Sequence, residues 1–205
     1  MIRATFYTRF FKLFLDRLAA LLMLIVLSPV LIVLALLVKC TSRGPVFFKQ
    51  RRIGLNKAEF NIFKFRTMYV DAPGNVPTHM LQNAKSFITP VGRFYRKSSL
   101  DELPQLLNII RGEMSFIGPR PALWNQYDLI AERDKYSANA MLPGVTGWAQ
   151  VEGRDELPIP EKAAKDGYYA AHASFALDVK ILVRTAVNVL SARGVVEGAA
   201  AGDRK

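Results

Sequence analysis

The chain has 205 residues, enough for one compact domain with appendages and too few for two domains of ordinary size. Lysine and arginine outnumber aspartate and glutamate by 28 to 17, so the expected partner is anionic: nucleic acid, lipid headgroups or a phosphorylated substrate. The single cysteine excludes an intrachain disulfide and a disulfide-stapled secreted domain, which fits a reducing, cytoplasm-facing location.

An apolar stretch near the start of the chain is long enough to enter a membrane. Residues 18–38 carry no formal charge, and as one helix they would extend about 31 Å. One interpretation is a single transmembrane helix. A cleavable signal peptide is disfavoured, because the stretch is longer than the usual apolar core and is followed by Lys39 and Cys40 instead of a small-residue cleavage site.

Two features of this stretch favour a different arrangement. Ser28 and Pro29 lie at its middle, where proline removes a backbone donor and the serine hydroxyl can bond to a freed carbonyl. Basic residues also lie on both sides, so both ends prefer the cytoplasm. A hairpin that enters one leaflet and returns, with arms of ~15 Å, accounts for both features. A proline-kinked spanning helix stays open on the residues alone.

A second part of the chain begins after Gly44 and Pro45. Residues 46–48 and 60–65 are rich in β-forming residues and predict two strands, joined as a hairpin through a turn at 52–57. The hairpin carries a basic set with interleaved aromatic residues, which suits single-stranded nucleic acid as well as phosphate. We prefer a solvated face beside anionic lipid. The basic residues are Lys49, Arg51, Arg52, Lys57, Lys64 and Arg66.

Two adjacent carboxylates, Asp101 and Glu102, precede a predicted helix. Apolar residues recur at helical spacing over 103–110, and Gly112 supplies a C-terminal stop. Pro104 fits the first turn, where its missing donor costs nothing, so we expect the helix to begin close to Asp101. The two carboxylates would then lie at the positive end of a helix dipole.

Acidic residues at a helix start are ordinary, because capping and the helix dipole both favour them. Here Arg93, Arg96 and Lys97 are near in sequence, and a nearby cation would keep Asp101 ionised. An ionised carboxylate can attack phosphorus or coordinate a hard divalent cation. Two carboxylates could divide the work, one as nucleophile and one holding Mg²⁺ against a diphosphate.

The downstream half adds a rigid turn and three further segments. Pro119 and Pro121 fix the backbone on either side of Arg120 and aim it outward. The glycine-punctuated segment 143–154 predicts a loop and short strand that approach a ligand closely. Residues 177–190 predict a helix that lies at a membrane interface or packs on the core, and 194–205 predict a disordered tail.

Several motifs follow one another over about 10–190. They are the Ser-Pro in the apolar stretch, Phe-Lys-Phe-Arg-Thr-Met at 63–68, Ser-Leu-Asp-Glu-Leu-Pro-Gln at 99–105, Met-Ser-Phe-Ile-Gly-Pro-Arg-Pro at 114–121 and Pro-Gly-Val-Thr-Gly-Trp-Ala-Gln-Val at 143–151. In this order they resemble the bacterial sugar transferases, and more narrowly the small monotopic phosphoglycosyl transferases of the PglC-like branch.

The resemblance implies an α+β fold in two parts. The first, 1–43, would be a re-entrant membrane helix-break-helix with its break at Ser28 and Pro29. The second, 44–193, would be a compact, mostly helical cytoplasmic domain with a small β-hairpin and interfacial amphipathic helices. It implies a monotopic enzyme on the cytoplasmic face of the bacterial inner membrane.

The implied reaction transfers a sugar 1-phosphate from a UDP-sugar to polyprenyl (undecaprenyl) phosphate and releases UMP. Asp101 would be the nucleophile that carries the phosphosugar covalently, and Glu102 would bind Mg²⁺. Arg96 would contact phosphate, and Arg120, in its turn between Pro119 and Pro121, the nucleotide or diphosphate.

The expected partners are therefore a UDP-sugar, polyprenyl phosphate and inner-membrane phospholipid, without nucleic acid; a homodimer is also considered. The alternative hypothesis is a non-catalytic basic membrane module that binds anionic lipid or nucleic acid. It accounts for the charge and the apolar stretch, but gives no reason for Asp101 and Glu102 beside a Pro-Arg-Pro turn.

Overall fold

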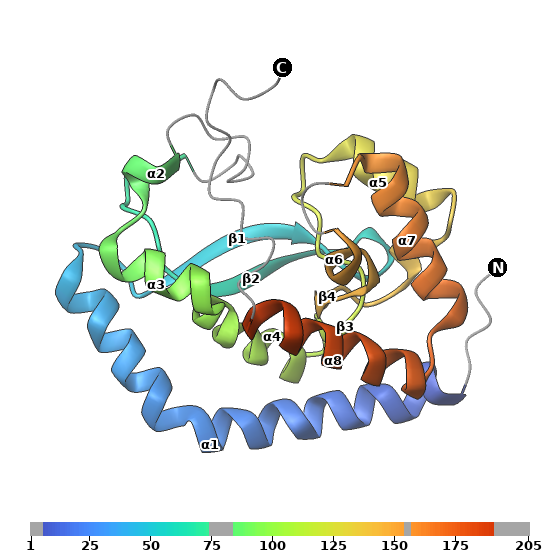
Figure 1. Cartoon of the computed structure of the whole chain (residues 1–205), viewed down its shortest axis with the longest axis horizontal. Coiled ribbons are helices and arrows are strands. Elements are labelled where there is room, and N and C mark those ends of the chain that lie inside the picture. Colours follow the sequence, from blue (N-terminus) through green and yellow to red (C-terminus); the bar gives the residue numbers. More distant parts are fainter. Residues whose placement is uncertain (1–5, 74–83, 154–156, 191–205) are drawn as a thin grey trace.

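The structure, a computed structural model, describes residues 6–73, 84–153 and 157–190 (Figure 1). Helices predominate, and two small sheets lie among them. The predicted α+β, mostly helical class is confirmed for these residues. The predicted tail, 194–205, lies outside them.

A long apolar helix runs along one side of the molecule (Figure 1). A π-helical turn, η1 (Tyr7–Phe11), leads directly into α1 (Lys12–Thr41). The helix continues through Pro29 and bends near its middle (Figure 1). Ser28 Oγ donates a 2.8 Å hydrogen bond to the carbonyl oxygen of Ile25, the acceptor that loses its usual donor at Pro29. The serine thus compensates for the proline.

Both halves of α1 pack against the rest of the chain. In the first half Ala20 lies in a buried cluster with Ile62, and in the second half Leu34 and Val38 pack around Tyr95. The other side of α1 is exposed and apolar. Its exposed side chains include Leu22, Ile25, Val26, Ile32, Val33 and Leu36. Among the described residues, this helix alone is long and apolar enough to cross a membrane.

The predicted hairpin is confirmed. Strands β1 (Phe47–Ile53) and β2 (Glu59–Phe65) pair antiparallel, joined by the 3₁₀ turn η2 (Leu55–Lys57). Strand β2 is the part of the hairpin that contacts the following segment. Ile62 is buried in the core, and Lys64 forms an ion pair with Glu102 of that segment. Because side chains alternate along a strand, Ile62 and Lys64 lie on the same face of β2.

Four short helical segments follow β2: α2 (Ala84–Phe87), α3 (Pro90–Ser98), η4 (Leu100–Gln105) and α4 (Leu106–Ile110). The predicted helical segment does begin close to Asp101, at Leu100, but its first part is a 3₁₀ helix. Asp101 lies in the 3₁₀ turn η4, which contains Pro104, and regular α-helix begins only at Leu106. Gly112 ends the segment with a φ of 77°, as its predicted stop position requires.

The remaining chain builds a second small sheet and a helical wall. Strands β3 (Ser115–Ile117) and β4 (Gly144–Thr146) are parallel. The helices are α5 (Tyr127–Asp134), η5 (Ala138–Ala140), α6 (Trp148–Glu152), α7 (Ile159–His172) and α8 (Phe175–Leu190). The predicted last helix is thus present, and its exposed apolar residues are Phe175, Val179, Leu182, Val183 and Val187.

A buried polar network fastens α8 to the start of α1. Asp178 accepts hydrogen bonds of 2.7 Å from the hydroxyl of Tyr7, the ammonium of Lys12 and the hydroxyl of Tyr169. Asp16 accepts one of 2.5 Å from the hydroxyl of Ser115 on β3. Each carboxylate is compensated by donors from other elements, as burial of a charge requires.

Candidate active site

A cavity of about 910 Å³ lies beside β1 and reaches several elements of the fold. Its volume is in the range of small-molecule sites in proteins. Asp101, Glu102, Arg96, Arg120 and Pro121 line it, together with residues of β1, β2, α5, α7 and α8. Five of the residues predicted for the site therefore share one cavity.

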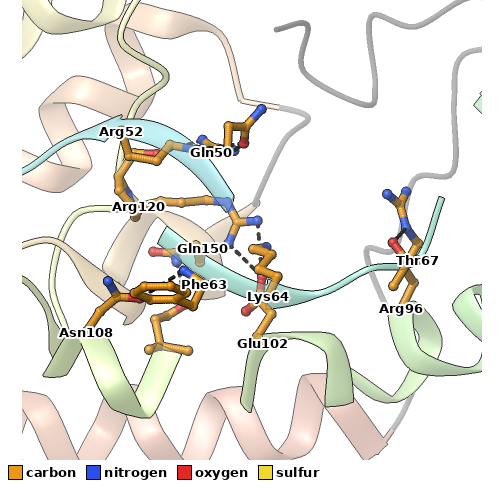
Figure 2. A network of polar contacts seen from close by, with 12 residues as sticks. Gln50, Arg52, Phe63, Lys64, Thr67, Arg96, Glu102, Asn108, Arg120 and Gln150 are labelled. Carbon is orange, nitrogen blue, oxygen red and sulfur yellow. Dashed lines mark hydrogen bonds and ion pairs between the residues drawn. The ribbon is translucent and has the colours of Figure 1, made fainter. Parts of the chain in front are cut away.

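The two carboxylates of η4 have different surroundings. Glu102 Oε1 accepts a 2.6 Å hydrogen bond from Lys64 Nζ and lies 3.4 and 3.5 Å from the two terminal nitrogens of Arg120 (Figure 2). The Asp101 side chain is buried, with 9% of the residue exposed, and none of the described residues donates a hydrogen bond to its carboxylate. Glu102 is held in an ion-pair network, whereas Asp101 is left available to a substrate.

These surroundings separate the two pKa values. Burial raises the pKa of Asp101 to about 6, with Lys64 opposing the rise and Glu102 adding to it. Burial also acts to raise the pKa of Glu102, but Lys64 and Arg120 outweigh it and lower that pKa to about 2. Near neutral pH, Glu102 is a fixed anion, and Asp101 is ionised but poorly stabilised. A poorly stabilised carboxylate is suited to nucleophilic attack.

Arg96 comes to the cavity from α3 and lies apart from the Lys64, Glu102 and Arg120 group (Figure 2). Its Nε donates a 2.9 Å hydrogen bond to the hydroxyl of Thr67. Its charge still acts on Asp101, whose pKa it lowers. Cations therefore lie on two sides of Asp101, Arg96 on one and the Lys64 and Arg120 pair on the other. Such an arrangement can bind an anionic group that carries two phosphates.

The turn that carries Arg120 is held from both sides. Arg52 donates a 2.9 Å hydrogen bond to the carbonyl oxygen of Pro121, and the backbone nitrogen of Ile53 donates one of 2.9 Å to Ala122. On the other side, Gly144 donates a 2.9 Å backbone hydrogen bond to the carbonyl of Pro119. Pro119 itself is not among the cavity-lining residues, so it shapes the turn from behind.

Ser28 and Pro29 do not reach the cavity. Their structural role is the compensated bend of α1. The helix instead contributes Met23, which lines the cavity together with Asn188 and Val189 of α8. The cavity thus extends from the Asp101 and Glu102 pair, the carboxylate dyad, to α1 and α8, the two helices that carry the exposed apolar surface.

Lys64 and Asn108 are important residues of the site that the sequence did not single out. Lys64 was predicted only as part of a basic face, and its contact with Glu102 depends on packing of β2 against η4. Asn108 is fully buried; its Oδ1 accepts from the backbone of Phe63 at 3.0 Å and its Nδ2 donates to the carbonyl of Asn61 at 2.8 Å (Figure 2). It fixes β2, and with it Lys64.

The donor set fits Mg²⁺ with help from a substrate. Among the described residues, no three carboxylate, histidine or cysteine side chains gather around one point. Mg²⁺ commonly needs only one or two carboxylates, because substrate phosphates and water complete its octahedron. The Lys64 and Arg120 contacts use only Oε1 of Glu102, so its Oε2 is a suitable ligand.

The chain is similar in sequence to known proteins. It is 38% identical over 182 residues to the uncharacterized sugar transferase EpsL of Bacillus subtilis, covering 88% of this chain and 87% of that protein. It is 41% identical over 182 residues to the UDP-glucose:undecaprenyl-phosphate glucose-1-phosphate transferase of Xanthomonas campestris pv. campestris, with 85% of this chain and 38% of that protein covered.

A third relative is the UDP-N-acetylgalactosamine-undecaprenyl-phosphate N-acetylgalactosaminephosphotransferase of Aeromonas hydrophila, 36% identical over 193 residues. The match covers 90% of this chain and 45% of that protein. The chain thus spans less than half of these two larger relatives. Residues 7–192 match the family described as bacterial sugar transferase. The chain belongs to the bacterial sugar transferase family.

Proposed function

We propose that the protein transfers a sugar 1-phosphate from a UDP-sugar to undecaprenyl phosphate, as the first membrane step of bacterial glycan assembly. The observation that carries this proposal is the pair of carboxylates in one cavity: Glu102 is bound by Lys64 and Arg120, and the neighbouring Asp101 is buried beside it. The names of the Xanthomonas and Aeromonas relatives supply the two substrates. Those names differ in the sugar, so we propose the class of reaction and no particular sugar.

The first step is attack by an Asp101 carboxylate oxygen on the phosphorus that bears the sugar. A new oxygen–phosphorus bond forms, the bond to the bridging oxygen breaks, and UMP leaves with that oxygen. Arg120 and Lys64 lie where they can stabilise negative charge on the diphosphate, and Arg96 can hold it from the opposite side.

In the second step a phosphate oxygen of undecaprenyl phosphate attacks the same phosphorus. The bond to Asp101 breaks, which regenerates the carboxylate and yields the lipid-linked diphosphosugar. No external proton donor is needed for either leaving group, because both depart as anions near neutral pH. The extension of the cavity to Met23 and Val189 gives a lipid acceptor an apolar approach to the dyad.

Bound Mg²⁺ would neutralise charge on the donor diphosphate and on the departing UMP. Glu102, through its Oε2, is the residue proposed to hold it. Glu102 is suited to this role because its low pKa keeps it ionised at every physiological pH.

We also propose that α1 is a re-entrant element, which makes the protein monotopic on the cytoplasmic face of the inner membrane. Both halves of α1 pack against the same domain, Ala20 in one buried cluster and Leu34 in another. A straight spanning helix would carry one half away from that domain. The exposed apolar sides of α1 and α8 would contact the acyl region and the interface.

The test is release of UMP by the purified protein in nanodiscs with Mg²⁺, undecaprenyl phosphate and a panel of UDP-sugars. We expect turnover with at least one donor and its loss in Asp101→Asn. A matched control is Asp134→Asn, which removes an exposed carboxylate outside the cavity. No UMP with any donor, together with salt-sensitive nucleic-acid binding, would instead support the basic membrane module.

A further inference from the structure

Two pairs of consecutive residues meet at the edge of the cavity. Arg66 and Thr67 follow β2, and Tyr95 and Arg96 lie near the end of α3. One member of each pair makes the hydrogen bond between Arg96 Nε and Thr67 Oγ1, at 2.9 Å (Figure 2). Of the other two, Tyr95 contacts the second half of α1 and Arg66 contacts the residues that directly follow α1. These contacts together connect α1 to Arg96, which lines the cavity.

The distance between Thr67 and α3 is fixed by close backbone packing. The carbonyl oxygen of Thr67 accepts a 3.0 Å hydrogen bond from the backbone nitrogen of Thr89, which caps α3. Gly92 lies so close to that carbonyl that a Cβ would overlap it. Arg96 is one helical turn after Gly92 and therefore lies on the same side of α3. The packing thus delivers Arg96 to the Thr67 hydroxyl.

The neighbouring residues hold α1 through its backbone. The hydroxyl of Tyr95, which is fully buried, donates a 2.7 Å hydrogen bond to the carbonyl oxygen of Leu34. Nη2 of Arg66 donates 2.8 Å to the carbonyl of Ser42, just after α1 ends, and its Nη1 donates to the carbonyl of Arg43. A shift of this part of α1 would move both partners of the Arg96 hydrogen bond.

We propose that Thr67 is a positioning residue that directs Arg96 toward the donor diphosphate, and that Tyr95 and Arg66 link its placement to the second half of α1 and to the residues that directly follow it. An arginine side chain has many rotamers, and an acceptor at Nε fixes the plane of the guanidinium and the direction in which its terminal nitrogens point. Thr67 contacts no reacting atom, so it acts through Arg96. The inference rests on the proposed donor reaction.

The experiment compares initial rates of UMP release in nanodiscs for the wild type, Thr67→Val, Thr67→Ser, Arg96→Ala and the Thr67→Val/Arg96→Ala double variant. Valine keeps the shape of threonine and removes the acceptor, and serine restores the acceptor. We expect Thr67→Val to raise the KM for the UDP-sugar about tenfold, as loss of a hydrogen bond to a charged group predicts, with a smaller change in kcat. Thr67→Ser should stay close to wild type.

The double-mutant cycle separates positioning from a general structural role. If Thr67 acts through Arg96, Thr67→Val should have little further effect in the Arg96→Ala background. An equal tenfold loss in both backgrounds, an unchanged KM in Thr67→Val, or a Thr67→Ser as impaired as the valine variant would each overturn the proposal. A wild type that releases no UMP would refute the proposed function instead.

Tyr95→Phe tests the link to α1, since it removes only the hydroxyl that bonds to Leu34. We expect about a threefold rise in the donor KM, with the KM for undecaprenyl phosphate unchanged. An unchanged donor KM would overturn the link to α1.

Discussion

Replacing Asp101 by asparagine should abolish turnover and at the same time stabilise the protein at neutral pH. Burial raises the pKa of this carboxyl from its ordinary value of 3.8 to about 6, so the folded state disfavours its charge. A pKa about two units above the usual value corresponds to about 3 kcal/mol of lost stability when the group is ionised. Asparagine has almost the same shape and never ionises, so it removes this cost.

The pH dependence of the stability gain tests whether ionisation of Asp101 causes it. Below pH 3.8 Asp101 is protonated in both the folded and unfolded states, and the two proteins should have the same Tm. As pH rises from 3.8 to 6 the unfolded state loses its proton first, so the wild type loses stability relative to the variant. Above pH 6 the difference should be constant, on the order of 5 to 10 °C in Tm.

Thermal unfolding of both proteins in the same detergent, followed between pH 4 and 8, measures this difference. The matched control is Asp134→Asn: hydrogen bonds from Asn139 and Lys57 lower the pKa of that exposed carboxyl, so its replacement should give no gain in Tm at pH 7.5. A Tm gain for Asp101→Asn that does not change with pH, or a loss of stability at pH 7.5, would refute the reasoning.

Three further predictions follow from other parts of the structure. The kcat/KM for UMP release should fall to half near pH 6 and to about a tenth near pH 5, as Asp101 takes up a proton; a profile flat from pH 5 to 7 would contradict this. Arg133→Met should lower the free energy of unfolding by about 3–5 kcal/mol in denaturant titrations, because it leaves the buried Asp166, bonded at 2.6 and 2.8 Å, without its partner. Cysteines introduced near residues 5 and 45 should be labelled from the same side of the membrane, and labelling from opposite sides would exclude a re-entrant α1.

Local features of the chain were predictable because they depend on near neighbours. The bend of α1 follows from Ser28 and Pro29, since the lost donor and the hydroxyl that replaces it are within one turn. The β1–β2 hairpin follows from its β-rich strands and short turn. The carboxylate pair was also identifiable, although the expected α-helix start proved to be a 3₁₀ turn that accommodates Pro104.

The remaining parts of the site depend on contacts between residues distant in sequence. Lys64 and Glu102 are 38 residues apart, and nothing near either one indicates their 2.6 Å contact. The buried amide of Asn108 likewise bonds to Asn61 and Phe63 across 47 and 45 residues. The sequence indicated the two carboxylates and cations that would keep Asp101 ionised, but not that burial raises the pKa of Asp101 while Lys64 and Arg120 lower that of Glu102.

The most direct test of the account is the mass of the intact protein after incubation with a UDP-sugar and Mg²⁺ in the absence of undecaprenyl phosphate. The account predicts an adduct of one sugar phosphate on the wild type, located at Asp101, accompanied by stoichiometric UMP and discharged when undecaprenyl phosphate is added. The Asp101→Asn variant should form no adduct. UMP release that requires undecaprenyl phosphate from the first turnover, with no adduct on a fully active protein, would contradict the covalent mechanism and indicate direct transfer.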